Sequence, residues 1–345
     1  MFPFFKKLIG FVAIAVVPLI IFLIGYIHYD PFGVIKDYGT YTYSKPVPHV
    51  IPNRDFINTA IYLKTAPAKK YNSFVFGSSR TSGITSSSWK KYLANDDKVF
   101  FFDASGEAIY GIYTKLKFLD KVNAPIDNAL ILFCRDAVFE YTEDFNNHLT
   151  IKHPVTSNRS WLRFHFVFFK AYLNLKFLAS FYNYTFTGQL KPFMKDYIEA
   201  GTMDFDPISN GVSMAGIEGE IAKDTAAYYA SRSGLFFERK GESFDSLNRI
   251  NRKSLHMLQD IKSILSKHNT QYKIILSPIY DQVKFSAADL RTMRQIFGSN
   301  LYDFTGETAI TRSKFNWYET KHFRTFVGDS ILNVVYQQPQ KKLEK

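Results

Sequence analysis

The sequence predicts an α/β fold built on an open, doubly wound sheet of parallel strands. Short apolar runs alternate along the chain with segments of helical periodicity. The apolar runs contain few polar residues, which is typical of strands that are buried on both faces of a parallel sheet. Together these observations favour one sheet with helices on its two faces. The 345 residues, of which 46% are hydrophobic and 21% are charged, suffice for a large folded core.

Five runs are expected to be strands, in an N-terminal group of three and a C-terminal group of two. They are residues 73–77, 98–103, 129–134, 272–278 and 301–304.

Helical patterns are expected at residues 110–122, 243–269 and 286–297, and a closing helix at residues 322–336. In the second of these helices one apolar stripe consists of Leu247, Ile250, Leu258, Ile261 and Leu265. Because folds of this class hold their sites at the carboxyl ends of the strands, the residues just after each strand are the candidates for function.

Residues 140–242 interrupt the alternation and are expected to form a helical insert. Within it, residues 161–186 place aromatic side chains on nearly every side of any helix. The same stretch carries Arg163, Lys170 and Lys176, which disfavours a second membrane span. The interpretations stay open: the core of a helical insert over the sheet, or a functional face, either a membrane-facing platform or a docking face for a membrane partner.

The N-terminus is predicted to be a transmembrane anchor. Residues 8–27 contain no charge, and 20 helical residues span roughly 30 Å, the thickness of a bilayer core. Lys6 and Lys7 precede this run and Asp30 follows it, which places residues 1–7 in the cytoplasm. A cleaved signal peptide is the alternative, but no small-residue cleavage site follows Ile27.

Two further segments follow the predicted anchor. Residues 28–70 are expected to be a linker or N-terminal extension, and residues 71–345 an extracytoplasmic domain, periplasmic or at the cell surface.

Composition narrows the partners and cofactors. The formal charge of +12 suits an anionic lipid surface or an anionic polymer, whereas nucleic acid is not expected for an exported chain. The single cysteine, Cys134, cannot form an internal disulfide and lies in an apolar run, so a buried thiol is expected. No cysteine and histidine set has zinc spacing, and no phosphate-binding or dinucleotide loop is found, so neither a metal nor a cofactor is expected.

A serine and a histidine at distant strand ends are the candidate catalytic residues. Ser79 ends the turn Gly77-Ser78-Ser79 after the first strand. A serine nucleophile needs a base within hydrogen-bonding reach, and the base needs an orienting acceptor. His322 and Glu319 supply these groups in the segment before the closing helix, where a spacing of three residues lets the carboxylate accept the Nδ1 hydrogen. We therefore expect Ser79 and His322 to converge at one edge of the sheet.

These residues resemble the SGNH, or GDSL-type, hydrolase superfamily. The family's first block, Gly-Asp-Ser or a variant, is matched by Gly77-Ser78-Ser79, which makes Ser79 the implied nucleophile. Its last block, Asp-x-x-His, is matched by Glu319 and His322, with a longer carboxylate. The glycine of the second block, whose backbone N–H helps to bind the oxyanion, is matched by Gly106. The resemblance covers residues 70–135 and 243–335 and implies a flavodoxin-like sheet.

The third block of the family, Gly-x-Asn-Asp, is not found in this sequence. In "FCRDAVF", Arg135 occupies the position of the asparagine, whose side chain is an oxyanion donor in the family. Arg135 could donate to the oxyanion instead, or it could form a structural ion pair with Asp136.

The predicted anchor and the first block narrow the resemblance to two groups. These are the D-alanine transfer proteins of teichoic-acid synthesis and the SGNH proteins of exopolysaccharide O-acetylation. Both imply acyl-ester chemistry on an envelope polysaccharide, with a multi-spanning membrane-bound O-acyltransferase as partner. Water as acceptor would make the protein an esterase, and a sugar hydroxyl would make it a transferase. The alternative is a catalytically weak or inactive scaffold, or a glycan-binding component of such a complex.

Overall fold

The computed structural model describes residues 2–37, 48–139, 146–201 and 203–337, with only the backbone described for residues 2–3, 5–13 and 15. It confirms an α/β architecture around a five-stranded sheet in which every neighbouring pair is parallel. All five predicted strands are present: β2 (Ser73–Phe76), β3 (Val99–Phe101), β4 (Asn128–Phe133), β9 (Gln271–Leu276) and β11 (Leu301–Asp303). Their order in the sheet is β11-β9-β4-β2-β3.

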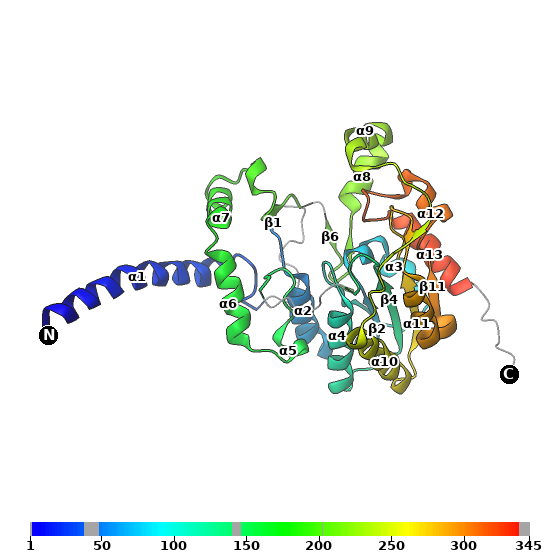
Figure 1. The fold of residues 1–345 in the computed structure, drawn as a ribbon, viewed down its shortest axis with the longest axis horizontal. Helices are drawn as coiled ribbons and strands as arrows, with labels where there is room; N and C mark the ends of the chain where they lie inside the picture. The colour runs from blue at the N-terminus through cyan, green and yellow to red at the C-terminus, as the bar shows by residue number, and fades with distance from the viewer. Residues whose placement is uncertain (1, 38–47, 140–145, 202, 338–345) are drawn as a thin grey trace.

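Helices cover both faces of the sheet (Figure 1). The side chains of β2 show the division, because Phe74 and Phe76 join one hydrophobic core and Val75 joins the other. The first core is formed with α2 (Arg54–Lys69), α4 (Ile109–Lys121), α10 (Arg252–Lys267) and α11 (Ala287–Phe297). The second is formed with α3 (Ser86–Lys90) and α13 (Thr325–Gln337).

Two sequence expectations about the helices of the first core were wrong. Helix α10 begins at Arg252, so Leu247 lies outside it and is exposed. The segment expected to be a linker contains α2, which begins at the N-cap Asn53 and packs against the sheet. Its buried face carries Arg54 and Asp55, which pair with residues distant in the chain. Residues 38–47 of that segment lie outside the described residues.

Helix α1 (Phe2–Tyr29) projects from the domain (Figure 1). Within the described part of the chain, no helix has both the length and the apolar character that a membrane span requires. The predicted span at residues 8–27 therefore has no support there, and the side chains of residues 8–13 and 15 lie outside the description. The carboxyl-terminal end of α1 packs on the insert, where the ring centroids of Tyr26 and Phe169 lie 5.5 Å apart.

The insert is mainly helical, as predicted, although residues 140–145 lie outside the described residues. Phe164, Phe168 and Tyr172 bury one face of α6 in the first core. The elements of the insert are α5 (Pro154–Ser157), α6 (Trp161–Tyr172), α7 (Leu175–Thr187), η2 (Pro192–Met194), β5 (Ile198–Glu199), β6 (Asp204–Phe205), β7 (Val212–Ser213), α8 (Ala215–Lys223), α9 (Thr225–Ser231) and η3 (Ser233–Leu235). The remaining elements are β1 (His49–Val50), η1 (Ser79–Gly83), β8 (Ser243–Phe244), β10 (Val283–Lys284), η4 (Gly298–Asn300), α12 (Ala309–Arg312) and η5 (Lys314–Asn316).

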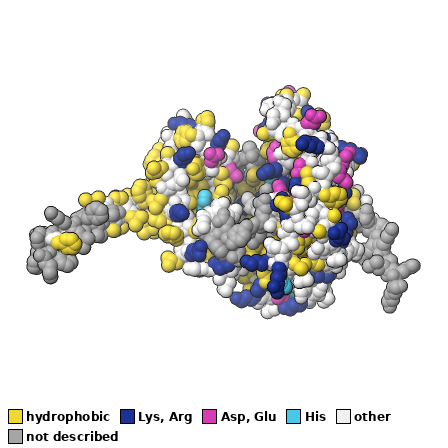
Figure 2. Space-filling model, in the orientation of Figure 1, with side chains coloured by type: hydrophobic (Ala, Val, Ile, Leu, Met, Phe, Trp, Pro, Cys, Tyr) yellow, Lys and Arg dark blue, Asp and Glu magenta, His cyan; other side chains and the backbone are white. Residues whose placement is uncertain are grey.

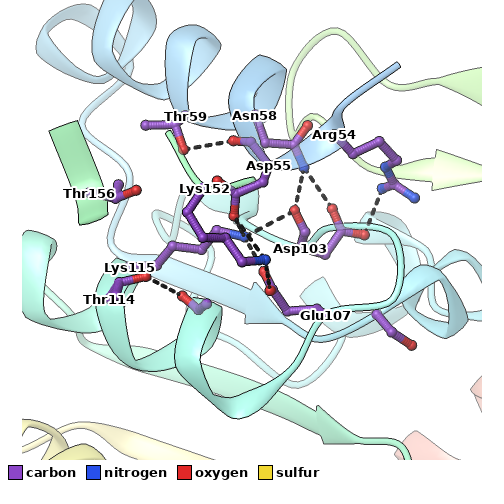
Figure 3. A network of polar contacts seen from close by, with 12 residues as sticks. Arg54, Asp55, Asn58, Thr59, Asp103, Glu107, Thr114, Lys115, Lys152 and Thr156 are labelled. Atoms are coloured by element: carbon purple, nitrogen blue, oxygen red, sulfur yellow. Dashed lines mark hydrogen bonds and ion pairs between the residues drawn. The ribbon is translucent and has the colours of Figure 1, made fainter. Parts of the chain in front are cut away.

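A buried cluster of charges joins α2, α4 and the insert at the carboxyl end of β3 (Figure 3). The Lys115 ammonium lies 3.0 Å from a carboxylate oxygen of Asp55 and also pairs with Glu107. Lys152 pairs with the other oxygen of Glu107. Asp103 accepts hydrogen bonds from Arg54 at 2.7 Å and from the Asn58 amide at 2.8 Å.

The cluster is balanced, because three cations, Arg54, Lys115 and Lys152, meet three carboxylates, Asp55, Asp103 and Glu107. Burial alone raises the pKa of Asp55, but the charges of Lys115 and Lys152 outweigh it and lower that pKa to about 2. A buried charge is tolerated only where it is paired. These contacts therefore fix the position of α2 against the loop that follows β3.

We expect Lys115→Met to lower the free energy of unfolding by about 3–5 kcal/mol, because it leaves buried carboxylates without their cation. Lys117→Met, on the exposed side of the same helix, is the matched control and should change it by no more than about 0.5 kcal/mol. Chemical denaturation of both variants measures the difference. Equal stabilities would show that the cluster does not hold α2 and α4 together.

Candidate active site

The turn after β2 presents one of its serines to solvent. Gly77 has φ of 152°, and a Cβ atom there would lie 2.9 Å from the Cβ of Leu132. The chain can therefore pass close to β4 only with glycine at this position. The turn then enters η1, in which Ser79 is half-buried while its neighbours Ser78 and Arg80 are buried. Ser79 is thus the hydroxyl of this turn that a substrate could reach.

Ser79, His322 and Glu319 form a hydrogen-bonded line. The Ser79 Oγ lies 2.8 Å from the His322 Nε2, although 243 residues separate the two in the chain. The His322 Nδ1 contacts a carboxylate oxygen of Glu319. The convergence expected from the sequence is therefore present, in the order nucleophile, base and orienting carboxylate.

The carboxylate of Glu319 is held in its ionised form. Burial alone raises the pKa of this group, but the hydrogen bond and the charge of His322 outweigh that effect. Backbone N–H groups of Lys321 and His322 donate to the carboxylate at 2.8 and 2.9 Å and lower its pKa further. An ionised acceptor at Nδ1 keeps the proton on that nitrogen and leaves the Nε2 lone pair for the Ser79 hydroxyl.

Arg80 links the turn of the serine to the loop of the histidine. Its side chain is buried, and its two terminal nitrogens donate to the two oxygens of Asp136 at 2.6 and 2.9 Å. Its Nε donates to the carbonyl oxygen of Lys321, next to His322, at 2.6 Å. Asp136 follows β4, so one guanidinium connects three loops at one edge of the sheet. Sequence reasoning missed this residue, although an arginine directly after the Gly-Ser-Ser turn was a visible signal.

Helix α9 of the insert holds the histidine loop by hydrogen bonds to its backbone. The hydroxyls of Tyr228 and Tyr229 in α9 donate to the carbonyl oxygens of Tyr318 and Trp317 at 2.9 and 2.8 Å. The Tyr318 N–H in turn donates to the carbonyl oxygen of His322 at 2.9 Å. Part of the insert, which the sequence reasoning left outside the site, therefore holds the backbone that carries the base.

The buried charge cluster at the carboxyl end of β3 contacts the serine turn through Thr81. The Thr81 hydroxyl donates to the carboxylate of Asp103, the group that Arg54 and Asn58 also bind. The Thr81 backbone N–H donates to the carbonyl oxygen of Ser78 at 3.0 Å. The turn that bears Ser79 is thus fixed from below by side chains of α2.

Two predicted oxyanion residues have different outcomes. Arg135 does not pair with Asp136; its guanidinium is bound by Asp245 at 3.2 Å and by Asp281. The ion-pair alternative named the wrong carboxylate because Arg80 already occupies Asp136. Gly106 lies exposed in the loop after β3 with φ of 58°, a conformation that favours glycine. Its role as an oxyanion donor stays a prediction.

The thiol of Cys134 lies beneath the serine turn. Cys134 is buried, as expected, with its sulfur 3.0 Å from the Ser78 Oγ. Among the residues that the structure describes, no group of three or more histidine, cysteine or acidic side chains could hold a metal ion.

Comparison with known proteins adds no family to this geometry. No family model and no curated relative matches the sequence. The resemblance to SGNH hydrolases therefore stays a prediction.

The contribution of Glu319 to the free energy of unfolding should decrease as the pH falls. Because the folded state lowers the pKa of this carboxyl, its contribution is complete above the ordinary glutamate range of about 4.3 and is lost as the pH falls below it. The wild type should therefore exceed Glu319→Gln in unfolding free energy near neutral pH, and the gap should shrink at acid pH. Denaturation of both proteins across this range measures the gap. A gap that widens toward acid pH would contradict the assignment.

The contact between η1 and α13 leaves no room for a side chain at Gly328. A Cβ atom at Gly328 would lie 1.9 Å from the carbonyl oxygen of Gly83, whereas one at the helical Gly219 would meet nothing within 4 Å. Gly328→Ala should therefore destabilise the protein by about 1–3 kcal/mol through overpacking. Gly219→Ala should stabilise it by about 0.5–1 kcal/mol through helix propensity. Thermal unfolding compares the two, and shifts of the same sign would refute the close packing.

Proposed function

We propose that this protein carries out serine acyl-transfer or esterase chemistry on a cell-envelope glycan outside the cytoplasm. The observation that carries the proposal is the hydrogen-bonded line from Ser79 through His322 to Glu319. A hydroxyl in contact with an imidazole, itself held by a carboxylate, is the arrangement that activates serine toward acyl carbonyl groups.

The reaction proceeds in two transfers. The His322 Nε2 removes the Ser79 proton while Oγ attacks the acyl carbonyl, and the resulting imidazolium is stabilised by Glu319. Collapse of the tetrahedral intermediate breaks the bond to the leaving oxygen, which takes the proton from His322. Water or a sugar hydroxyl then attacks the Ser79 ester, gives its proton to His322 and departs with the acyl group as Ser79 regains its proton. Water gives an esterase, and a sugar gives a transferase.

The order of the strands supports an SGNH-type, flavodoxin-like fold. Numbered along the chain, the five strands of the sheet lie in the order 2-1-3-4-5. In sheets of this order, ligands bind at the carboxyl ends of the strands where the order reverses. Here that point lies between β2 and β4, and the Arg80 to Asp136 pair crosses it.

A groove beside η1 supports a glycan as the acceptor. Its volume is about 440 Å³, which lies within the usual range for small-molecule sites. Strand β7 packs against η1, and the groove begins at Ile84, directly after η1. Hydroxyls and carboxylates suit the hydrogen-bonding groups of a sugar. They belong to Thr85, Ser86, Ser87, Asp204, Asp206, Ser209 and Ser213.

The proposal includes an envelope location. In it, α1 anchors the chain to the membrane with residues 1–7 in the cytoplasm, and a multi-spanning membrane-bound O-acyltransferase supplies the acyl group. Exposed apolar side chains of α1, among them Ile14, Ile21 and Ile24, support the anchoring. The formal charge of +12 supports an anionic envelope surface or polymer.

The test is covalent labelling of the purified full chain with a fluorophosphonate probe, alongside hydrolysis of an aryl acetate ester. We expect labelling at Ser79, abolished in Ser79→Ala. His322→Gln and Glu319→Gln should slow labelling and ester cleavage by about 10³-fold or more, because the three groups act as a unit. Ser266→Ala, an exposed serine of α10 outside the groove, is the matched control and should label at the wild-type rate.

A non-catalytic scaffold or glycan-binding component is the second candidate. It is favoured by one observation, the capture of Arg135 by Asp245 and Asp281, because this leaves no side chain of the third block assigned to the oxyanion. Loss of a single oxyanion donor typically slows catalysis by about 10²–10³-fold. A wild-type chain of native circular dichroism that takes no label would favour this candidate over the enzyme.

A further inference from the structure

We propose that the exposed apolar face of α6 and α7 docks on an anionic lipid surface. We call this face the α6–α7 face, and it consists of Leu162, Phe166, Leu175 and Phe186. Their side chains are 82%, 64%, 81% and 74% exposed. The proposal adds a second membrane contact to the anchoring proposed for α1, and it does not depend on the chemistry of Ser79.

Helix α6 carries apolar side chains on its buried side and also on an exposed side, and packing in the core accounts only for the buried ones. Phe164 and Phe168 already bury one side of the helix, against Phe56 of α2 and against Phe32. Leu162 and Phe166, four residues apart, occupy another side and remain exposed. Neighbouring exposed apolar side chains of this size mark an interaction surface.

The basic residues around the α6–α7 face favour an anionic lipid surface as its binding partner. Residues 161–195 contain no aspartate or glutamate, and their five basic residues are Arg163, Lys170, Lys176, Lys191 and Lys195. Apolar side chains flanked by cations suit an interfacial helix on anionic lipids, where long basic side chains extend toward the headgroups. A second copy of the chain would bring these cations against one another, which disfavours self-association through this face.

Both helices that carry the α6–α7 face contact the carboxyl-terminal end of α1. The ring of Tyr26 packs against Phe169 of α6, and the ring of Tyr29 packs against Phe181 of α7. Figure 1 shows α6 crossing the end of α1, and Figure 2 shows apolar side chains along the described part of α1 and on the adjoining surface, with basic side chains among them. A lipid surface that meets α1 would therefore meet the α6–α7 face as well.

The protein carries its own reporter for this contact. Of its three tryptophans, Trp89 and Trp317 are fully buried, whereas Trp161 is 46% exposed at the start of α6. Quenching of tryptophan fluorescence by brominated acyl chains requires van der Waals contact with lipid. Such quenching therefore reports lipid contact at the start of α6, which contact through α1 alone would not produce.

The experiment mixes the full chain with vesicles of phosphatidylcholine and phosphatidylglycerol that carry brominated acyl chains. We expect quenching that is lost in Trp161→Phe and that weakens when phosphatidylglycerol is omitted. Leu162→Ser and Phe166→Ser should each weaken the lipid partitioning that quenching reports by about tenfold, the effect of one large apolar side chain. Leu247→Ser, an exposed leucine outside this face, is the matched control and should quench as the wild type does.

Three outcomes would overturn the proposal. The chain could sediment with vesicles while Trp161 stays unquenched, which would restrict lipid contact to other segments. Quenching could be the same in the Leu162 and Phe166 variants as in the wild type. A concentration-dependent shift of Trp161 emission without vesicles would instead show a protein contact. Probe labelling of Ser79 in Leu162→Ser is measured in parallel, so failure of this proposal and failure of the proposed function are distinguishable.

Discussion

The buried ammonium of Lys115 is the constraint on which the architecture around the site depends. A charge in the interior must be neutralised where it lies, so the carboxylates of Asp55 and Glu107 have to meet it. That requirement brings α2 onto the loop after β3, and Lys152 adds the insert to the same cluster. Thr81 extends the cluster to the serine turn through Asp103. The buried charge cluster at the carboxyl end of β3 and the position of the serine turn are thus linked through Asp103.

At the edge itself, loops from distant parts of the chain are held by a few directional bonds. Arg80 fixes the spacing between the serine turn, the loop after β4 and the histidine loop through three donors of one planar group. Tyrosine hydroxyls from α9 hold the histidine loop through its carbonyl oxygens. Ser79 and His322, whose side chains approach to 2.8 Å, need this support because one begins the short helix η1 and the other lies in a loop, and neither lies within a strand or a long helix.

Sequence reasoning succeeded where one physical signal dominated. The five strands were predictable because uninterrupted apolar runs leave few alternatives, and the meeting of Ser79 and His322 followed from the parallel arrangement of their strands. It failed where side chains are buried by mutual pairing. Residues 28–70, with their scattered proline, tyrosine and lysine, were expected to be a linker or N-terminal extension, whereas Arg54 and Asp55 of α2 are buried because residues distant in the chain pair with them. The pairing of Arg135 with Asp245 and Asp281 was equally hidden, because no local spacing indicates which of several carboxylates an arginine will choose.

The distance between Ser79 and His322 along the chain, 243 residues, also has a consequence for biosynthesis. A chain emerges from the ribosome with its N-terminal part first, and contacts of such long range form late. A nascent chain that has emerged only as far as β9 carries the serine turn but has neither the imidazole nor the helix α13 that packs on that turn. Prematurely terminated chains of this length would consequently lack the contact between Ser79 and His322, so the candidate site can form only after the segment that carries His322 has been synthesised.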